Sequence, residues 1–189
     1  MSFTIRHVTA IWVIIFLLAA SVHGAEIEDV SFEDSVEVNG TRITLRGAGL
    51  FRYMGFIKAY VGALYMLEDT PSEKVLSDTP KRLEIEYFHP IKAKDFGSAS
   101  KKIMARNVEP EAFEKLKHRL EQLNALYQDV QPGDRYSLDY FPGKGIELAL
   151  NGNFLGFVTG ADFASAVYAM WLGEKPMNNS FKQQLLGAS

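Results

Sequence analysis

One stretch of the sequence carries residue types that could bind an anion. Residues 47–67 form an apolar and aromatic run in which Arg52 and Lys58 are the only charged residues. A cation buried without a partner is unfavourable, so each must reach solvent, a distant acidic residue or an anionic ligand. If the run is a strand, Lys58 and Tyr60 share one face and could hold one anion together, with Arg52 nearby. The alternative is that Lys58 extends to solvent and Tyr60 belongs to the core.

Other kinds of site have less support in the sequence. After residue 24 the histidines are His89 and His118, which stand far apart and outside any HExxH pattern. We therefore expect no metal site. The chain has no cysteine and no GxSxG motif, which excludes a thiolate nucleophile and gives no support to a serine hydrolase. We expect no cofactor.

Two pairs of carboxylates deserve a structural interpretation. Glu84 and Glu86 alternate with apolar residues, so we expect them on the solvated face of a strand. Asp139 and Glu147 are placed to lie opposite each other across a hairpin. Both arrangements are more typical of a fold than of acid–base catalysis.

Composition limits the class of protein. The chain of 189 residues suits one domain, and 47% hydrophobic residues are enough for a sizeable core. The net charge of −3 gives no support to nucleic-acid binding, which requires a basic surface. We expect a protein that binds no nucleic acid, and the sequence leaves its oligomeric state open.

Residues 1–24 resemble a secretory signal peptide. Arg6 precedes an apolar run over residues 8–20, and small residues follow it up to Gly24. An uncleaved anchor is the alternative, but the run is shorter than the roughly 20 residues that a membrane span requires. We therefore expect cleavage before Ala25, a domain over residues 25–189 without a stable membrane span, and a periplasmic or secreted location.

The remaining pattern predicts an α+β domain. Alternating or apolar runs predict strands, and Asn39-Gly40 predicts a hairpin turn. A 3-4-3-4 spacing of apolar residues from Phe113 to Tyr127 predicts a surface helix that begins near Pro110. The predicted strands cover residues 26–38, 41–45, 56–67, 82–88, 135–141, 146–150 and 154–159, and the other predicted helices cover residues 71–77, 94–106, 161–172 and 181–186. We expect an antiparallel sheet covered on one face by a layer of helices, with Gly47-Ala48-Gly49 as a kink.

Several ordered segments resemble the bacterial chalcone isomerase-like family. They are GAGL, FIKAYVGALYM, QPGDRYSLDYFPGKGIELALNG and FASAVYAMWLGEKP, followed by a closing LLG. The resemblance covers residues 26–187. It implies an exported domain with the open-faced fold of plant chalcone isomerase and an apolar cleft between sheet and helices.

The resemblance carries over few of the plant enzyme's catalytic residues. Arg52 lies one residue beyond the position of the enzyme's Arg, and Tyr60 replaces its Thr. Phe96 falls near the catalytic Tyr and cannot donate a hydrogen bond, while Ser165 is the nearest late hydroxyl. No Asn matches, since Asn107 lies too far along the chain. Ring closure requires oriented donors that this sequence largely lacks.

Three functions follow as hypotheses. The first is a non-catalytic module that binds a hydrophobic carboxylate such as a fatty acid, as the resemblance to fatty-acid-binding relatives implies, with Arg52, Tyr60 and, less directly, Lys58 at the head group. The second is an isomerase, an intramolecular lyase acting on a small phenolic or enone substrate. The third is an interaction protein whose cleft is filled by its own side chains.

Overall fold

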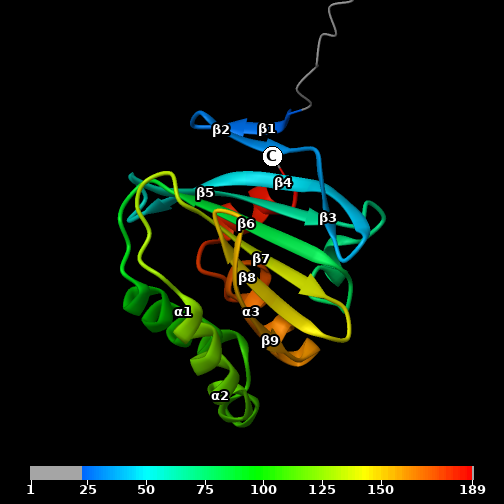
Figure 1. The fold of residues 1–189 in the computed structure, drawn as a ribbon, viewed down its shortest axis with the longest axis vertical. Coiled ribbons are helices and arrows are strands. Elements are labelled where there is room, and N and C mark those ends of the chain that lie inside the picture. The colour runs from blue at the N-terminus through cyan, green and yellow to red at the C-terminus, as the bar shows by residue number, and fades with distance from the viewer. Residues whose placement is uncertain (1–22, 189) are drawn as a thin grey trace, which may run out of the picture.

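The sheet of this protein is a seven-stranded antiparallel meander. The computed structural model describes residues 23–188, so the signal peptide predicted over residues 1–24 lies almost wholly outside the described residues. Each strand pairs with the next along the chain, and the sheet curls around the helices (Figure 1). In order the strands are β3 (Ser35–Val38), β4 (Thr41–Tyr53), β5 (Ile57–Met66), β6 (Lys81–Tyr87), β7 (Arg135–Phe141), β8 (Gly145–Leu150) and β9 (Asn153–Thr159).

Four helices form a layer on one face of this sheet, which confirms the predicted fold class (Figure 1). They are α1 (Ala93–Asn107), α2 (Pro110–Leu126), α3 (Ala161–Leu172) and α4 (Asn179–Leu185). The apolar stripe of α2 is buried, as its spacing predicted, and Asn178 caps α4 by accepting from the Phe181 N–H. The segment near Pro71 forms a single 3₁₀ turn, Ser72–Lys74.

The opposite face of the sheet is covered by a short hairpin. Strands β1 (His23–Ile27) and β2 (Val30–Glu33) pair with each other and lie across the sheet from the helices (Figure 1). Val30 and Phe32 are buried there in a second, smaller core with Val61 and Tyr65 of β5. The predicted strand over residues 26–38 is therefore three strands, because Glu28 and Asp29 adopt positive φ and turn the chain.

The prediction that Glu84 and Glu86 face solvent is wrong. Glu84 is only 9% exposed, and the β1–β2 hairpin covers this part of β6. Arg135 of β7 donates to Glu86 Oε2 at 2.7 Å and to Glu84 Oε2 at 3.2 Å, while its guanidinium lies 4.7 Å from the Phe32 ring. Strand alternation placed the glutamates on the correct face, but it could not show what covers that face.

Gly47 and Gly49 lie within one continuous strand, and the irregularity beside them is a register shift between Leu45 and Gly47, with Arg46 as the extra residue. β4 runs unbroken through both residues. A Cβ at Gly47 would lie 2.3 Å from the backbone oxygen of Gln184, and a Cβ at Gly49 would lie 2.4 Å from the Gln184 side chain. The same side chain accepts a 2.8 Å hydrogen bond from the Leu50 N–H. These glycines therefore allow α4 to approach the backbone of β4.

Within residues 23–188, none of the helices is both long and apolar enough to cross a membrane. The Asn39-Gly40 turn joins β3 to β4 as predicted, with positive φ at both residues.

Candidate functional site

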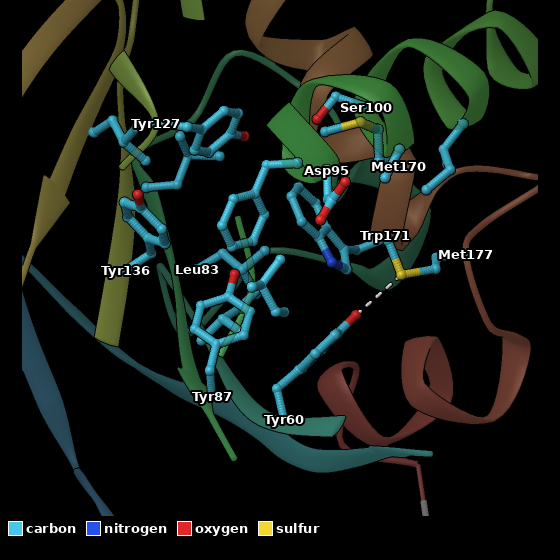
Figure 2. Close-up of a pocket in the computed structure, with 17 residues that line it drawn as sticks. Tyr60, Leu83, Tyr87, Asp95, Ser100, Tyr127, Tyr136, Met170, Trp171 and Met177 are labelled. Carbon is cyan, nitrogen blue, oxygen red and sulfur yellow. Dashed lines mark hydrogen bonds between the residues drawn. The ribbon is translucent and has the colours of Figure 1, made fainter. Parts of the chain in front are cut away.

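A cavity of about 270 Å³ lies between the sheet and the helices. Its walls come from β5, β6, β7, β8, α1, α3 and the segment between α3 and α4 (Figure 2). Aromatic and aliphatic side chains make up most of the lining, which consists of Tyr60, Leu83, Ile85, Tyr87, Ile91, Asp95, Phe96, Ala99, Ser100, Ile103, Tyr127, Tyr136, Leu138, Leu148, Met170, Trp171 and Met177.

Strand alternation and helix periodicity explain how these residues meet. Leu83, Ile85 and Tyr87 occupy every second position of β6 and therefore point to the helix side. Phe96 and Ser100 are four residues apart on α1 and lie on one face of that helix. The late helix α3 contributes Trp171 from its last turn. The cavity therefore depends on segments that are far apart in the sequence.

Packed aromatic rings form one rigid wall. Phe96 stacks on Tyr127 with ring centroids 5.1 Å apart, and Tyr136 meets both rings edge to face at 5.6 Å. The Tyr136 hydroxyl bonds the backbone of Gln128 as both donor and acceptor. This fixes the turn after α2 against β7, so the wall is preformed.

The opposite side of the cavity carries polar groups with weak partners or none. The Tyr60 hydroxyl donates to Met177 Sδ at 3.1 Å, and a thioether is a weak acceptor (Figure 2). Trp171 Nε1 is buried without a hydrogen-bond partner. Figure 2 shows the Tyr87 hydroxyl directed into the space between these side chains, but its oxygen is not among the fully buried atoms without a partner. Buried donors without a partner, such as Trp171 Nε1, are uncommon in proteins.

Burial keeps these hydroxyls neutral. It raises the pKa of Tyr60 and of Tyr87 well above the ordinary tyrosine value, and it raises the pKa of Tyr127 to about 12. The nearby Trp171 indole lowers the Tyr60 pKa in part. The distance and angle between the two groups are nevertheless not those of a hydrogen bond. At ordinary pH the cavity therefore offers neutral donors.

The lining contains no lysine or arginine. Of the lining residues in the described part of the chain, Asp95 alone carries a charge, and it lies exposed on the first turn of α1. Figure 2 shows its carboxylate among the side chains that line the cavity. A carboxylate ligand in this cavity would meet a like charge at Asp95 and no cation.

The predicted placement of Arg52 and Lys58 is wrong. Both side chains are about half exposed and pair with Glu28 in the β1–β2 turn, at 3.8 Å from Arg52 Nη2 and 2.5 Å from Lys58 Nζ. Neither residue lines the cavity, whereas Tyr60 does. No acidic residue lies near these cations in the sequence, since Glu28 precedes Arg52 by about 25 residues. The β1–β2 turn nevertheless brings Glu28 next to both cations, so each has an acidic partner.

A β-bulge explains why Lys58 and Tyr60 separate. Phe51 pairs with Tyr60 and Arg52 pairs with Lys58, so Ala59 is an extra residue in β5. One extra residue reverses the alternation of side chains beyond it. Tyr60 therefore faces the helices, where its ring stacks on Phe51 at 4.6 Å, and Lys58 faces the hairpin.

Of the other residues that the sequence analysis considered, some line the cavity and some do not. Phe96 lines the cavity, while Ser165 does not. Asn107 bonds the backbone of Ile103 and Lys175 and holds the end of α1 against the segment after α3. Among residues 23–188, no group of three or more histidine, aspartate or glutamate side chains could hold a metal ion.

Sequence reasoning did not identify Tyr87, Tyr136 and Trp171 as lining residues. The alternation of β6 already placed Tyr87 on the apolar face, so that residue could have been found. Trp171 had no such signal, because α3 is apolar on most sides and its cavity-facing side cannot be read from periodicity.

Comparisons with known proteins agree with this architecture. The chalcone isomerase-like family profile matches residues 24–187. The search of curated proteins found no match. Among solved structures, the fold is similar to the Arabidopsis thaliana fatty-acid binding protein AtFAP1, with a TM-score of 0.66 and 15% identity over 84% of this chain and 92% of that chain. The chain belongs to the chalcone isomerase-like family.

Proposed function

We propose that this protein is a non-catalytic module that binds a hydrophobic small molecule with an oxygen acceptor, such as a fatty acid in its neutral form. The observation that carries this proposal is a pair of donors inside an apolar cavity, Tyr60 with a weak partner and Trp171 with none. An unpaired buried donor is costly unless a ligand satisfies it. A carbonyl or carboxyl oxygen would satisfy these donors.

The size of the cavity limits the ligand. About 270 Å³ is near the lower end of the range of roughly 300–1,000 Å³ for ligand pockets. A chain of medium length or a molecule of one or two rings fits better than a long chain held entirely inside. The apolar lining would take the hydrocarbon part, and the donors would fix the position of the oxygen.

The charge of the site favours the neutral form of an acid. A carboxylate buried without a cation is strongly unfavourable, and Asp95 adds like-charge repulsion at the rim. A protonated acid or an ester keeps its acceptor oxygens without this penalty. The fold shared with a fatty-acid binding protein supports the choice of ligand class.

Titration with two matched ligands tests the proposal. Trp171 is the only tryptophan among the described residues, so its fluorescence reports on the cavity. We expect methyl decanoate to bind at pH 7.5 more tightly than decanoate, and the affinity for decanoic acid to increase as the pH falls toward 5. Tyr60→Phe should weaken binding of the ester about 3- to 10-fold, the value of one hydrogen bond.

Tyr53→Phe is the matched control, because it removes a hydroxyl that is exposed at the end of β4. It should leave the affinity unchanged. Tighter binding of decanoate than of its ester, or equal affinities of the wild type and Tyr60→Phe, would contradict the proposed site.

A second candidate is an isomerase acting on an enone. The observation in its favour is that the Asp95 carboxylate shares a cavity with the donors Tyr60 and Trp171. A base beside donors that polarise a carbonyl is the arrangement that proton transfer next to a carbonyl requires. Cyclisation of a chalcone by the wild type and its loss in Asp95→Asn would favour this function over simple binding.

We also propose that the protein is exported, on the basis of the pattern in residues 1–24. N-terminal sequencing of the protein from its own host should begin at Ala25. A chain that retains residues 1–24 would contradict cleavage.

A further inference from the structure

The tip of the β4–β5 hairpin exposes large apolar side chains. Tyr53 pairs with Ile57, which leaves Met54, Gly55 and Phe56 at the end of the hairpin. The exposed fractions are 57% for Tyr53 and 70% for both Met54 and Phe56. Three large apolar residues within four positions, all with this exposure, are unusual, because exposed apolar residues are normally scattered singly over a protein surface.

Backbone geometry shows that Met54 is a poor choice for the turn itself. Met54 and Gly55 have φ of 52° and 84°, as the central residues of a type I′ turn do, and the Phe56 N–H donates to the Tyr53 oxygen. Asparagine or glycine is favoured at the first of these positions, while a long side chain is disfavoured there. The side chain is also in solvent, so neither local folding nor core packing favours methionine at this position.

We propose that this tip inserts into the interfacial layer of a lipid bilayer. Tyrosine and phenylalanine are suited to the region between headgroups and acyl chains. Arg52 and Lys58 stand behind the tip, where their long side chains can extend toward headgroups while the apolar residues go deeper. A stable protein interface buries about 800 Å² on each partner, which a narrow convex tip of three side chains does not offer.

The charges near the tip specify the kind of membrane binding. Glu28 pairs with Arg52 and Lys58, and Asp29 is exposed beside it, so two acidic residues balance the two basic ones. Attraction to anionic lipids should therefore be small. Binding should occur on neutral phosphatidylcholine vesicles and should change little between low and high salt.

The tip lies close to the cavity along the chain. Tyr60 is four residues from Phe56, about 13 Å in an extended strand. A tip held in the bilayer would therefore bring the cavity near the apolar phase. The inference does not require the cavity to bind a ligand, because it rests on the exposed tip alone.

Co-sedimentation with phosphatidylcholine vesicles tests the inference on the protein isolated from its host. We expect Phe56→Ser to lower the partition coefficient about tenfold, the change expected when one large apolar side chain no longer enters the lipid. Phe154→Ser is the matched control, since Phe154 is 62% exposed on β9, which lies at the other edge of the sheet, away from the β4–β5 hairpin. It should leave the partition coefficient unchanged.

Met54→Asn separates membrane binding from folding. Asn-Gly suits a type I′ turn, so this variant should have a melting temperature about 2–4 °C higher than the wild type. It should nevertheless bind vesicles more weakly. If Met54→Asn binds vesicles as well as the wild type does, the tip does not enter the lipid and the inference is wrong.

A reporter in the tip gives a direct second measurement. The Phe56→Trp variant should gain a fluorescence component that shifts to shorter wavelength with vesicles and is quenched by brominated lipids. A signal that vesicles leave unchanged would overturn the inference. A tip that instead mediates self-association, seen as loss of a dimer in Phe56→Ser by analytical ultracentrifugation without any vesicle binding, would also overturn it.

Discussion

The two faces of the sheet bury polar groups in opposite ways. On the hairpin face Arg82 binds Asp139 and Glu84, and Arg135 binds Glu84 and Glu86. On the helix face the cavity holds neutral donors with weak partners or none, and the lining has no basic side chain. Opposite charges are matched on the hairpin face, although the buried Tyr65 hydroxyl there has no partner, while the donors on the helix face line a cavity.

This difference separates structural from binding roles. The hairpin-face cluster holds β1 and β2 on the sheet, since Arg135 also donates to the backbone oxygen of Ser31. Its guanidinium groups are engaged, so they are not free to bind an anion. Tyr60, with a weak partner, and Trp171, with none, line an apolar cavity, whereas Tyr65 does not, which is why we place the ligand on the helix face.

The largest expected effect comes from breaking the charged cluster. Arg82→Met removes both nitrogens that bind the Asp139 carboxylate and leaves that nearly buried charge unpaired. The free energy of unfolding should fall by about 3 kcal/mol, measured by urea denaturation. Lys117→Ala removes an exposed pair with Glu114 and should change the free energy of unfolding by less than about 0.5 kcal/mol. Equal effects of the two variants would show that burial of the cluster does not matter.

Blocking the cavity should abolish binding on the other face. Ala99 lines the cavity from an exposed position on α1, so Ala99→Trp can place an indole in the opening without disturbing the core. We expect methyl decanoate to bind at least about tenfold more weakly, because the indole takes the space of the ligand. Calorimetric titration of Ala99→Trp and of Ser98→Trp, one residue earlier and outside the lining, measures this. Equal affinities would place the ligand elsewhere.

The pH dependence of stability should report the burial of Glu84. Burial raises the Glu84 pKa in the folded state, although Arg135 and Arg82 act in the opposite direction. The folded state therefore binds the proton more tightly than the unfolded chain, and this contribution to stability is lost as the pH rises from about 4.5 through the raised pKa. The stability of the wild type minus that of Glu84→Gln should fall from pH 4.5 to pH 7.5. An increase over this range would mean that the arginines dominate.

Arg52→Ala should have the smallest effect. Its guanidinium lies across the sheet from the cavity and is 3.8 Å from Glu28 in an exposed pair. Affinity for methyl decanoate should stay within the error of a fluorescence titration, and the free energy of unfolding should change by less than about 0.5 kcal/mol. A clear loss of affinity would restore Arg52 to the binding site and require a different position for the ligand.

The sequence predicted elements better than it predicted the site. The α2 stripe and the Asn39-Gly40 turn depend on local patterns, and the structure confirms them. The positions of Lys58 and Tyr60 depended on unbroken alternation, which the bulge at Ala59 changes. No composition signal marks a bulge, and none shows that a distant Glu28 pairs with two cations.

The glycines of β4 illustrate the same limit. Gly47 and Gly49 were expected to bend the chain, because glycine is often found at bends. The register shift lies at Arg46, and glycine is required at both positions by the approach of α4, about 135 residues later in the chain. A local pattern cannot distinguish these two reasons for glycine.

Native mass spectrometry of the protein purified from its own host tests the central claim most directly. The account predicts that the wild type carries a small hydrophobic molecule, released on activation, and that the Ala99→Trp variant purified in the same way does not. The same molecule in equal amounts on both variants would contradict a ligand site in the helix-face cavity. So would a wild-type protein that carries no ligand and takes up no added methyl decanoate.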